Sequence, residues 1–165
     1  MDSREYAKEH KYDFYSHVIA GKHIGSTKDA IFMAGSPGAG KTEVATELLS
    51  FYHNMVIIDA DRFREGFPTY NGANSSEIQP GASWLVGDIF NRVSDEGYSV
   101  LLDGTFALAS ASKNIERVLK RNYNVSIYYV YQDPMIAWEF VKQREKVEGR
   151  NVPKERFINA YFMAR

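Results

Sequence analysis

An eight-residue segment of this chain has the residue types and the spacing of a phosphate-binding loop. It fits the pattern G-x-x-x-x-G-K-[ST] at every fixed position. Glycines let consecutive backbone N–H groups turn toward a phosphate without a Cβ clash, a lysine adds a cation near the β- and γ-phosphates, and a threonine hydroxyl can bind Mg²⁺. An apolar run precedes the segment and a helical pattern follows it. The residues predicted to bind the phosphates of ATP are Gly35, Ser36, Pro37, Gly38, Ala39, Gly40, Lys41 and Thr42.

A base for phosphoryl transfer is predicted three residues after the second apolar run, which ends at Ile58. Moving a γ-phosphoryl group requires an acceptor, a group that takes the acceptor's proton, and cations that stabilise the transition state. Asp61 lies where a parallel strand would end, at the edge of the sheet that binds ligands, and we predict it to be the general base. Arg64, one helical turn later, is predicted to orient the acceptor. The alternative is that Asp61 only caps a helix and that Arg64 is a solvated side chain.

A second carboxylate follows the third apolar run. Asp103 comes after Val100-Leu101-Leu102 and before a glycine, which is the form of the second nucleotide-triphosphatase motif that holds Mg²⁺ or its water. With the phosphate loop present, we predict that Asp103 contacts metal or substrate and that Thr42 is the other protein ligand of the metal. A strand that merely ends in an Asp-Gly turn is the alternative.

Two arginines belong to a predicted lid at residues 143–153, which includes a glycine-to-proline segment. Arg144 lies late in a helix expected to begin after an Asp-Pro pair, and Arg150 lies within the segment itself. Guanidinium groups that close onto a γ-phosphate neutralise the charge that develops there during transfer. We predict that both arginines are catalytic, together with Lys41 and Asp61. A surface salt bridge to a neighbouring glutamate is the alternative for either arginine.

These side chains must be positioned by alternating strands and helices. Apolar runs predict strands at 30–34, 55–58, 99–102 and 125–131, and helical periodicity predicts helices at 43–52, 82–96 and 110–121. Asp133-Pro134 and Pro153 are each expected to open a further helix. Alternation of this kind predicts an α/β fold of the P-loop kinase type, with a parallel sheet flanked by helices on both faces.

The two ends of the chain carry additional helical patterns. Residues 1–29 are predicted to be an extension with one amphipathic helix, carrying Tyr6, Phe14 and Val18, that packs on the domain. The last predicted helix is still apolar-periodic at Arg165, where a sheet of this class usually receives a further strand. We therefore expect that a C-terminal part of the domain has been truncated.

Composition limits the class of protein and its partners. The chain has 165 residues, 44% of them hydrophobic, and this suits one globular domain over residues 1–165. It has no cysteine, which excludes disulfides and thiol nucleophiles. With no apolar leader and no stretch that could span a membrane, the protein is expected to be cytoplasmic and not bound to a membrane. Its net charge of −1 gives no general attraction to nucleic acid, so a nucleic-acid site would have to be local, and nucleic acid is not the expected partner. The basic stripe Lys113, Arg117, Lys120 and Arg121 is expected to be a solvated face.

Together these motifs resemble the zeta toxin family of kinases, the bacterial P-loop enzymes of epsilon–zeta toxin–antitoxin systems. The resemblance runs over residues 29–152. It rests on the loop at 35–42, on Asp59-x-Asp61-x-x-Arg64 followed by Phe67-Pro68-x-Tyr70, on Asp103-Gly104-Thr105 and on Arg144 and Arg150. It implies ATP-dependent phosphorylation of a sugar hydroxyl on UDP-N-acetylglucosamine, which blocks the synthesis of cell-wall precursors. It also implies an antitoxin protein as a partner.

The resemblance assigns a role to each matching residue. Lys41 would hold phosphate, Asp61 would be the base, and Asp103 and Thr105 would face the substrate. The two arginines, Arg144 and Arg150, would stabilise the transferred group. This chain departs from the family at two positions, because the family usually has Glu where Asp103 stands and Arg where Ala107 stands. Both departures concern the acceptor and leave the ATP chemistry intact.

Other acceptors and another class of protein therefore remain open. The Asp-x-x-Arg element serves any P-loop kinase that phosphorylates a hydroxyl, including the 5′-end of a nucleic acid or a small metabolite. A GTPase is disfavoured, because the sequence has no [NT]-K-x-D base-reading segment. A binding module that ATP switches without any phosphoryl transfer is the alternative outside enzymes.

Overall fold

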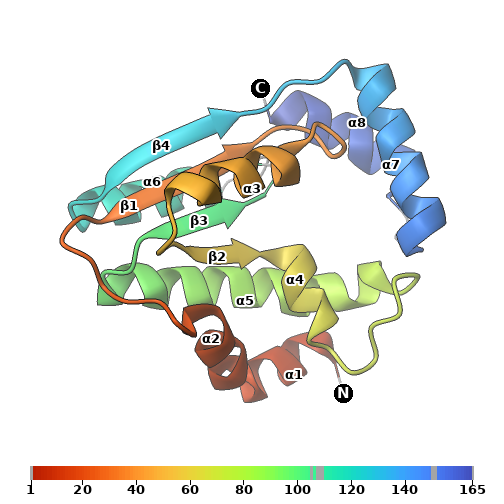
Figure 1. The fold of residues 1–165 in the computed structure, drawn as a ribbon. Helices are drawn as coiled ribbons and strands as arrows, with labels where there is room; N and C mark the ends of the chain where they lie inside the picture. Colours follow the sequence, from red (N-terminus) through yellow and green to blue (C-terminus); the bar gives the residue numbers. More distant parts are fainter. Residues whose placement is uncertain (1, 105, 107–109, 150–151, 165) are drawn as a thin grey trace.

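The structure is a computed structural model that describes residues 2–104, 106, 110–149 and 152–164. After a helical start, each strand is followed by one or two helices (Figure 1). Among the described residues, no helix is both long and apolar enough to cross a membrane. The helices are α1 (Ser3–Glu9), α2 (Lys11–Ile19), α3 (Lys41–Phe51), α4 (Ala60–Glu65), α5 (Ser75–Glu96), α6 (Ser110–Lys120), α7 (Pro134–Glu148) and α8 (Lys154–Met163). The strands are β1 (Asp29–Ala34), β2 (Val56–Asp59), β3 (Val100–Asp103) and β4 (Asn124–Tyr129).

The described strands form one parallel sheet in the order β2-β3-β1-β4. Ile31 in β1 is paired with Leu101 of β3 on one side and with Ser126 of β4 on the other. Since the strands run in the same direction, their carboxyl ends meet at one edge of the sheet, near α4 and α7 (Figure 1). The predicted α/β fold with a parallel sheet is confirmed, and each strand lies within two residues of its predicted bounds.

Successive residues of the strands enter two cores on opposite faces of the sheet. Ala30 and Phe32 of β1 belong to the larger core, which also takes side chains from α5 and α6. Ile31 and Met33 belong to the other core, where they pack with side chains of α3. This alternation is the period of a strand that is buried on both faces. Helix α3, which follows the phosphate loop, is thereby fixed on one face while α5 is fixed on the other.

Two short helices occupy the N-terminal segment for which the sequence predicts a single one. Helix α1 ends at Glu9 and α2 begins at Lys11, with His10 between them. The break lets each helix pack separately. The Ser3 hydroxyl at the start of α1 donates to the backbone carbonyl of Glu77 at 2.9 Å, and Phe14 of α2 packs against the larger core.

Helix α5 begins seven residues earlier than the predicted start at residue 82, at Ser75. Pro80 lies inside it, and a proline at an interior position removes one helical hydrogen bond and so predicts a later start. Tertiary packing outweighs this loss, since Ile78 is buried in the larger core and Gly81 lies so close to Ser3 that a Cβ would overlap its carbonyl. The additional turns bring Gln79 to the site described below.

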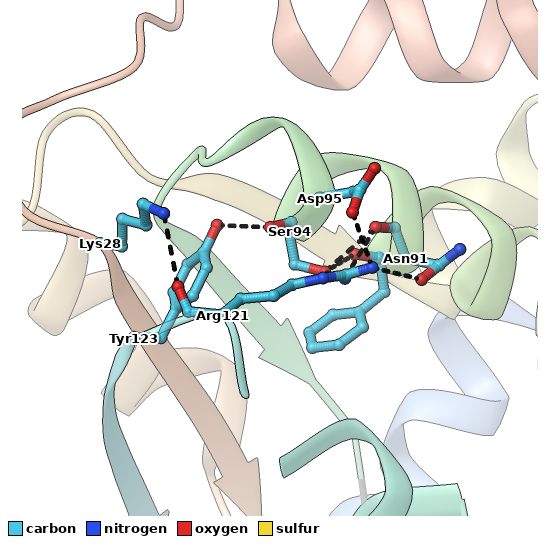
Figure 2. A network of polar contacts seen from close by, with 7 residues as sticks. Lys28, Asn91, Ser94, Asp95, Arg121 and Tyr123 are labelled. Atoms are coloured by element: carbon cyan, nitrogen blue, oxygen red, sulfur yellow. Dashed lines mark hydrogen bonds and ion pairs between the residues drawn. The ribbon is translucent and has the colours of Figure 1, made fainter. Parts of the chain in front are cut away.

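Polar contacts tie the start of β4 to the end of α5 (Figure 2). The Arg121 guanidinium donates to the backbone carbonyl of Asn91 at 3.1 Å and to the hydroxyl of Ser94 at 2.5 Å, and it forms an ion pair with Asp95 at 3.0 Å. The Tyr123 hydroxyl donates to the backbone carbonyl of Ser94 at 3.1 Å. The expectation that Arg121 belongs to a solvated basic face is therefore wrong, because its charge is used to hold a helix against the sheet.

Candidate active site

The phosphate loop connects β1 to α3 at the carboxyl edge of the sheet. Gly38 and Gly40 have φ angles of 75° and 91°, which lie in the left-handed region that favours glycine. A Cβ on Gly38 would overlap the backbone carbonyl of Ala137 in α7, so the loop lies directly against that helix. The sequence therefore encodes both the curvature of the loop and its close contact with α7.

The loop presents positive charge to its interior. The Lys41 ammonium donates to the backbone carbonyl of Ser36 at 2.8 Å, so it lies across the loop. Helix α3 begins at Lys41, and the N-terminus of a helix offers free N–H groups and the positive end of its dipole to an anion. Loop, ammonium and helix end therefore act on the same place, as the sequence predicts for a phosphate site.

An open cleft of about 450 Å³ lies between the loop and α7. Arg144 lines this cleft, and Phe140 and Val147 give the helical wall an apolar part. The lining residues are Gly38, Ala39, Gly40, Lys41, Thr42, Glu43, Gln132, Phe140, Gln143, Arg144 and Val147. The cleft thus has phosphate-binding groups on one wall and aromatic and aliphatic side chains with an arginine on the other, as a nucleotide requires.

Helix α7 begins where the sequence predicts, at the Asp133-Pro134 pair, and its two ends are both capped beside the loop. The Asp133 side chain accepts hydrogen bonds from the backbone N–H groups of Met135 at 2.8 Å and Ile136 at 3.3 Å, and Gly149 ends the helix with a φ of 68°. Four residues that line the cleft, Phe140, Gln143, Arg144 and Val147, follow helical spacing and lie on one face of α7.

Carboxylates collect at the ends of β2 and β3. Asp59 and Asp103 are register partners in these strands, and Asp61 follows in α4. Burial raises the pKa of Asp59 to about 6, and the negative charge of Asp61 adds to the rise. Burial also raises the pKa of Asp103, whereas the charge of Lys41 and a hydrogen bond with Thr42 lower it. These opposing influences indicate that Asp103 faces the phosphate loop.

Asp59, and not Asp61, caps helix α4. Its carboxylate accepts a hydrogen bond from the backbone N–H of Asp61 at 2.8 Å. The alternative role for Asp61 as a helix cap is therefore wrong, and its side chain, which is 38% exposed, remains at the ligand-binding edge of the sheet. Sequence reasoning assigned no role to Asp59, although an Asp two residues before the predicted base is a recognisable cap signal.

Arg64 is buried beneath this edge. Its side chain is only 6% exposed, and its guanidinium donates to the Asp61 carboxylate and to the side-chain oxygen of Gln79 in α5. The alternative in which Arg64 is a solvated side chain is therefore wrong. Sequence reasoning missed Gln79, because no helix was predicted at that position and a glutamine alone carries no chemical signal.

The side chains present suit a magnesium ion that is bound together with a nucleotide. Among the described residues, no group of three or more His, Asp or Glu side chains could form a metal site of its own. Mg²⁺ usually takes one or two protein oxygens and completes its shell with phosphates and water. Thr42 and Asp103, which lie close to each other, can supply such oxygens. Two predicted site residues, Thr105 and Arg150, lie outside the described residues.

The sequence of this chain matches a protein-family model and several known proteins. The zeta toxin family model matches residues 16–165. Toxin PezT of Streptococcus pneumoniae is 29% identical over 154 residues, which cover 84% of this chain and 61% of PezT. The curated relatives that this chain matches are longer than the chain itself. The match covers 61% of PezT and 59% of toxin zeta of Streptococcus pyogenes, which is about three fifths of each.

Solved structures show the same fold. A structure of the PezAT chromosomal toxin–antitoxin system of Streptococcus pneumoniae matches with a TM-score of 0.75 at 23% identity, covering 89% of this chain and 65% of that one. The complex of AvrRxo1-ORF1 and AvrRxo1-ORF2 with ATP matches with a TM-score of 0.69 at 11% identity, covering 98% of this chain and 55% of that one.

Proposed function

Because the chain belongs to the zeta toxin family, we propose that it is a P-loop kinase that transfers the γ-phosphoryl group of Mg·ATP to a hydroxyl of UDP-N-acetylglucosamine. One observation carries the proposal. The phosphate loop with Lys41, the carboxylates Asp61 and Asp103, and the cleft-lining Arg144 all lie at the same edge of the sheet. A phosphate loop with a base beside it is the arrangement that a kinase needs and that a simple nucleotide switch does not need.

The ATP side of the reaction is assigned to the loop and to α7. Lys41 leaves the Ser36 carbonyl for a phosphate oxygen, and the N–H groups of residues 38–42 surround the phosphates. Arg144 neutralises charge at the γ-phosphate from the opposite wall of the cleft, and Arg150 is proposed to join it. Thr42 and Asp103 would hold Mg²⁺, which, when bound, supplies positive charge to the β- and γ-phosphates.

Asp61 is assigned to the acceptor side. Its carboxylate takes the proton of the acceptor hydroxyl while that oxygen forms a bond to the γ-phosphorus and the bond from phosphorus to the ADP oxygen breaks. The products are ADP and a phosphorylated acceptor. Asp103 and Thr105 are proposed to contact the acceptor, and Arg64 contributes through Asp61, to which it donates a hydrogen bond.

A second acceptor class is favoured by a specific feature of the sequence. Asp103 stands where the family usually has Glu, and Ala107 stands where it usually has Arg, so this chain has a shorter acid and lacks one guanidinium on the acceptor side. Another hydroxyl compound can occupy such a site.

An antitoxin protein is proposed as the partner, since the matching PezAT structure belongs to a toxin–antitoxin system.

A panel of acceptors tests the proposal. The protein is incubated with Mg²⁺, ATP labelled at the γ-phosphate, and one acceptor at a time: UDP-N-acetylglucosamine, UDP-glucose, free N-acetylglucosamine or a 5′-hydroxyl oligonucleotide. Label transferred mainly to UDP-N-acetylglucosamine supports the proposed acceptor. Label transferred mainly to another compound would replace that acceptor with the second class, and transfer to none of them, with ATP still bound, would favour the binding module.

A further inference from the structure

One buried guanidinium links the proposed base to the longest helix of the described structure. Arg64 of α4 donates through Nη1 to Oδ1 of Asp61, and through Nη2 to Oε1 of Gln79. Asp61 and Gln79 lie in different helices, and the Arg64 guanidinium donates a hydrogen bond to each of them. Gln79 can therefore influence the position of the Asp61 carboxylate through Arg64.

Gln79 is itself fixed at both ends of its amide. Its Oε1 accepts from Arg64, and its Nε2 donates to the hydroxyl of Ser83 at 2.6 Å, one turn further along α5. The neighbouring residues Ile78 and Ala82 are buried in the larger core. The amide is thus a rigid acceptor on a helix that packing holds in place, and Arg64 is directed toward Asp61 from a fixed point.

Stability alone does not account for the buried guanidinium of Arg64. Its Nε is buried and has no hydrogen-bond partner within the part of the chain that the structure describes. A buried charge with an unsatisfied donor often stabilises a protein no better than an apolar side chain of the same volume, and each such group in a native structure requires an explanation. We explain the buried guanidinium by its effect on Asp61: it contacts the partly exposed carboxylate from the buried side and can fix its orientation.

We propose that Gln79 is a positioning residue of the phosphoryl transfer, which holds the Arg64 guanidinium so that Arg64 fixes the orientation of the Asp61 carboxylate at the acceptor site. The inference rests on the proposed function, because it assigns Asp61 as the base. A neutral amide suits this role better than a carboxylate, since a glutamate here would compete with Asp61 for the charge of Arg64.

Nuclear magnetic resonance tests the hold on Arg64 without any turnover. In the complete chain with ¹⁵N-labelled arginine, the Arg64 guanidinium of the unaltered protein should rotate slowly, and its Nη protons should exchange slowly with water. Gln79→Met removes the amide oxygen at similar side-chain length and should speed up both processes. The matched control is Glu77→Met, an exposed position on the same helix, which should leave both unchanged. Unchanged Arg64 signals in Gln79→Met would overturn the proposal.

Kinetics with the best acceptor test the consequence for catalysis. Gln79→Met should lower kcat by about 10- to 100-fold, as misplacement of a catalytic group does, with ATP affinity within about twofold of the unaltered protein. Gln79→Glu keeps an acceptor oxygen and should recover part of the loss, and Ser83→Ala, at an exposed position, should give a smaller loss in a protein that still folds. A Gln79→Met kcat equal to that of Glu77→Met would overturn the proposal.

The two experiments separate this proposal from the proposed function. If the unaltered protein phosphorylates no acceptor, the proposed function fails and so does the catalytic role of Gln79, whereas the magnetic resonance result still decides whether Gln79 holds Arg64. If transfer occurs but Gln79→Met keeps its full kcat, only the role of Gln79 is lost.

Discussion

Asp59 of β2 and Asp103 of β3 are register partners at the carboxyl edge of the sheet, and burial raises the pKa of both carboxyl groups. Asp61 adds a third acidic group to this edge, and its charge contributes to the rise at both positions. Two nearby cations, Lys41 with the larger effect and Arg62 with the smaller one, lower the pKa of Asp103. The described site thus gathers negative charge at the place where a Mg²⁺ ion, bound together with ATP, would supply positive charge.

Asp59→Asn should stabilise the protein above about pH 6. Folding raises the pKa of Asp59 from 3.8 to about 6, so the folded protein favours the neutral carboxyl group. The folded state therefore loses stability as the pH rises from 3.8 to about 6 and this group becomes charged. Asparagine stays neutral and can still cap α4. The gain in unfolding free energy should reach about 1 kcal/mol at pH 7.5 and vanish below about pH 4.

Urea unfolding at a series of pH values measures this effect. Glu65→Gln, at an exposed position in the same helix, controls for the loss of one negative charge. A stability difference between Asp59→Asn and the unaltered protein that is the same at pH 4 and pH 7.5 would contradict the raised pKa.

Gly38→Ala should damage the phosphate loop. Gly38 has a φ of 75°, and a Cβ there would overlap the carbonyl of Ala137, so the loop must move away from α7. We expect the affinity for ATP to fall at least about tenfold and the unfolding free energy to fall by about 1–3 kcal/mol. Calorimetric titration with Mg·ATP and thermal unfolding measure the two changes.

Gly87→Ala is the matched control for the loop variant. Gly87 is an exposed residue inside α5, and a Cβ there would have no described atom within 4 Å apart from its chain neighbours and the adjacent backbone of its own helix. Because alanine favours a helix over glycine, the variant should gain up to about 1 kcal/mol of stability and bind ATP normally. Equal ATP affinities of the two glycine variants would argue against a close fit between loop and α7.

Arg144→Ala should slow transfer more than it weakens ATP binding. Arg144 lines the cleft opposite the loop, and an arginine that acts on the transferred group contributes mainly in the transition state. We expect kcat to fall by about 100- to 1,000-fold, with less than about tenfold change in ATP affinity. Arg144→Lys keeps the charge without the planar fork and should recover part of the rate.

The control for Arg144 lies two residues further along α7. Lys146→Ala removes an exposed positive charge from the same helix and should keep the full rate. Single-turnover measurements with saturating ATP distinguish the two variants. Equal rates for Arg144→Ala and Lys146→Ala would show that the cleft-lining guanidinium is not used in transfer.

Arg121→Met should destabilise the fold without affecting chemistry. It removes hydrogen bonds to Asn91 and Ser94 and the ion pair with Asp95, which connect α5 to the start of β4 (Figure 2). We expect a loss of about 1–3 kcal/mol in urea unfolding. Lys120→Met, at the adjacent exposed position, should change stability by less than about 0.5 kcal/mol. A loss as small for Arg121→Met as for Lys120→Met would contradict the structural role of Arg121.

Sequence pattern predicted the parts of the site that depend on local chemistry. The glycines of the phosphate loop and the cap at Asp133 act on residues next to them in the sequence, and apolar runs indicate buried parallel strands. Each of these features can therefore be predicted from a short stretch of sequence. The direction of the strands then placed Asp61 and Asp103 at one edge.

Pattern did not predict the features that depend on contacts between distant elements. Whether Arg64 is solvated or buried is decided by the packing of α4 on α5, and the hydrogen bond to Gln79 exists only because α5 continues through Pro80. The helical spacing of Phe140, Gln143, Arg144 and Val147 was present in the sequence, but only the contact between Gly38 and α7 shows that this face meets the phosphate loop.

Mass spectrometry of UDP-N-acetylglucosamine after incubation with Mg·ATP tests both the proposed acceptor and the proposed base, with the unaltered protein and Asp61→Asn side by side. We expect a product heavier by one phosphoryl group from the unaltered protein, and a rate at least about 100-fold lower from Asp61→Asn at unchanged ATP affinity. An unaltered protein that binds ATP but yields no phosphorylated sugar nucleotide would contradict the proposed acceptor. An Asp61→Asn variant that forms product at the normal rate would contradict the proposed base.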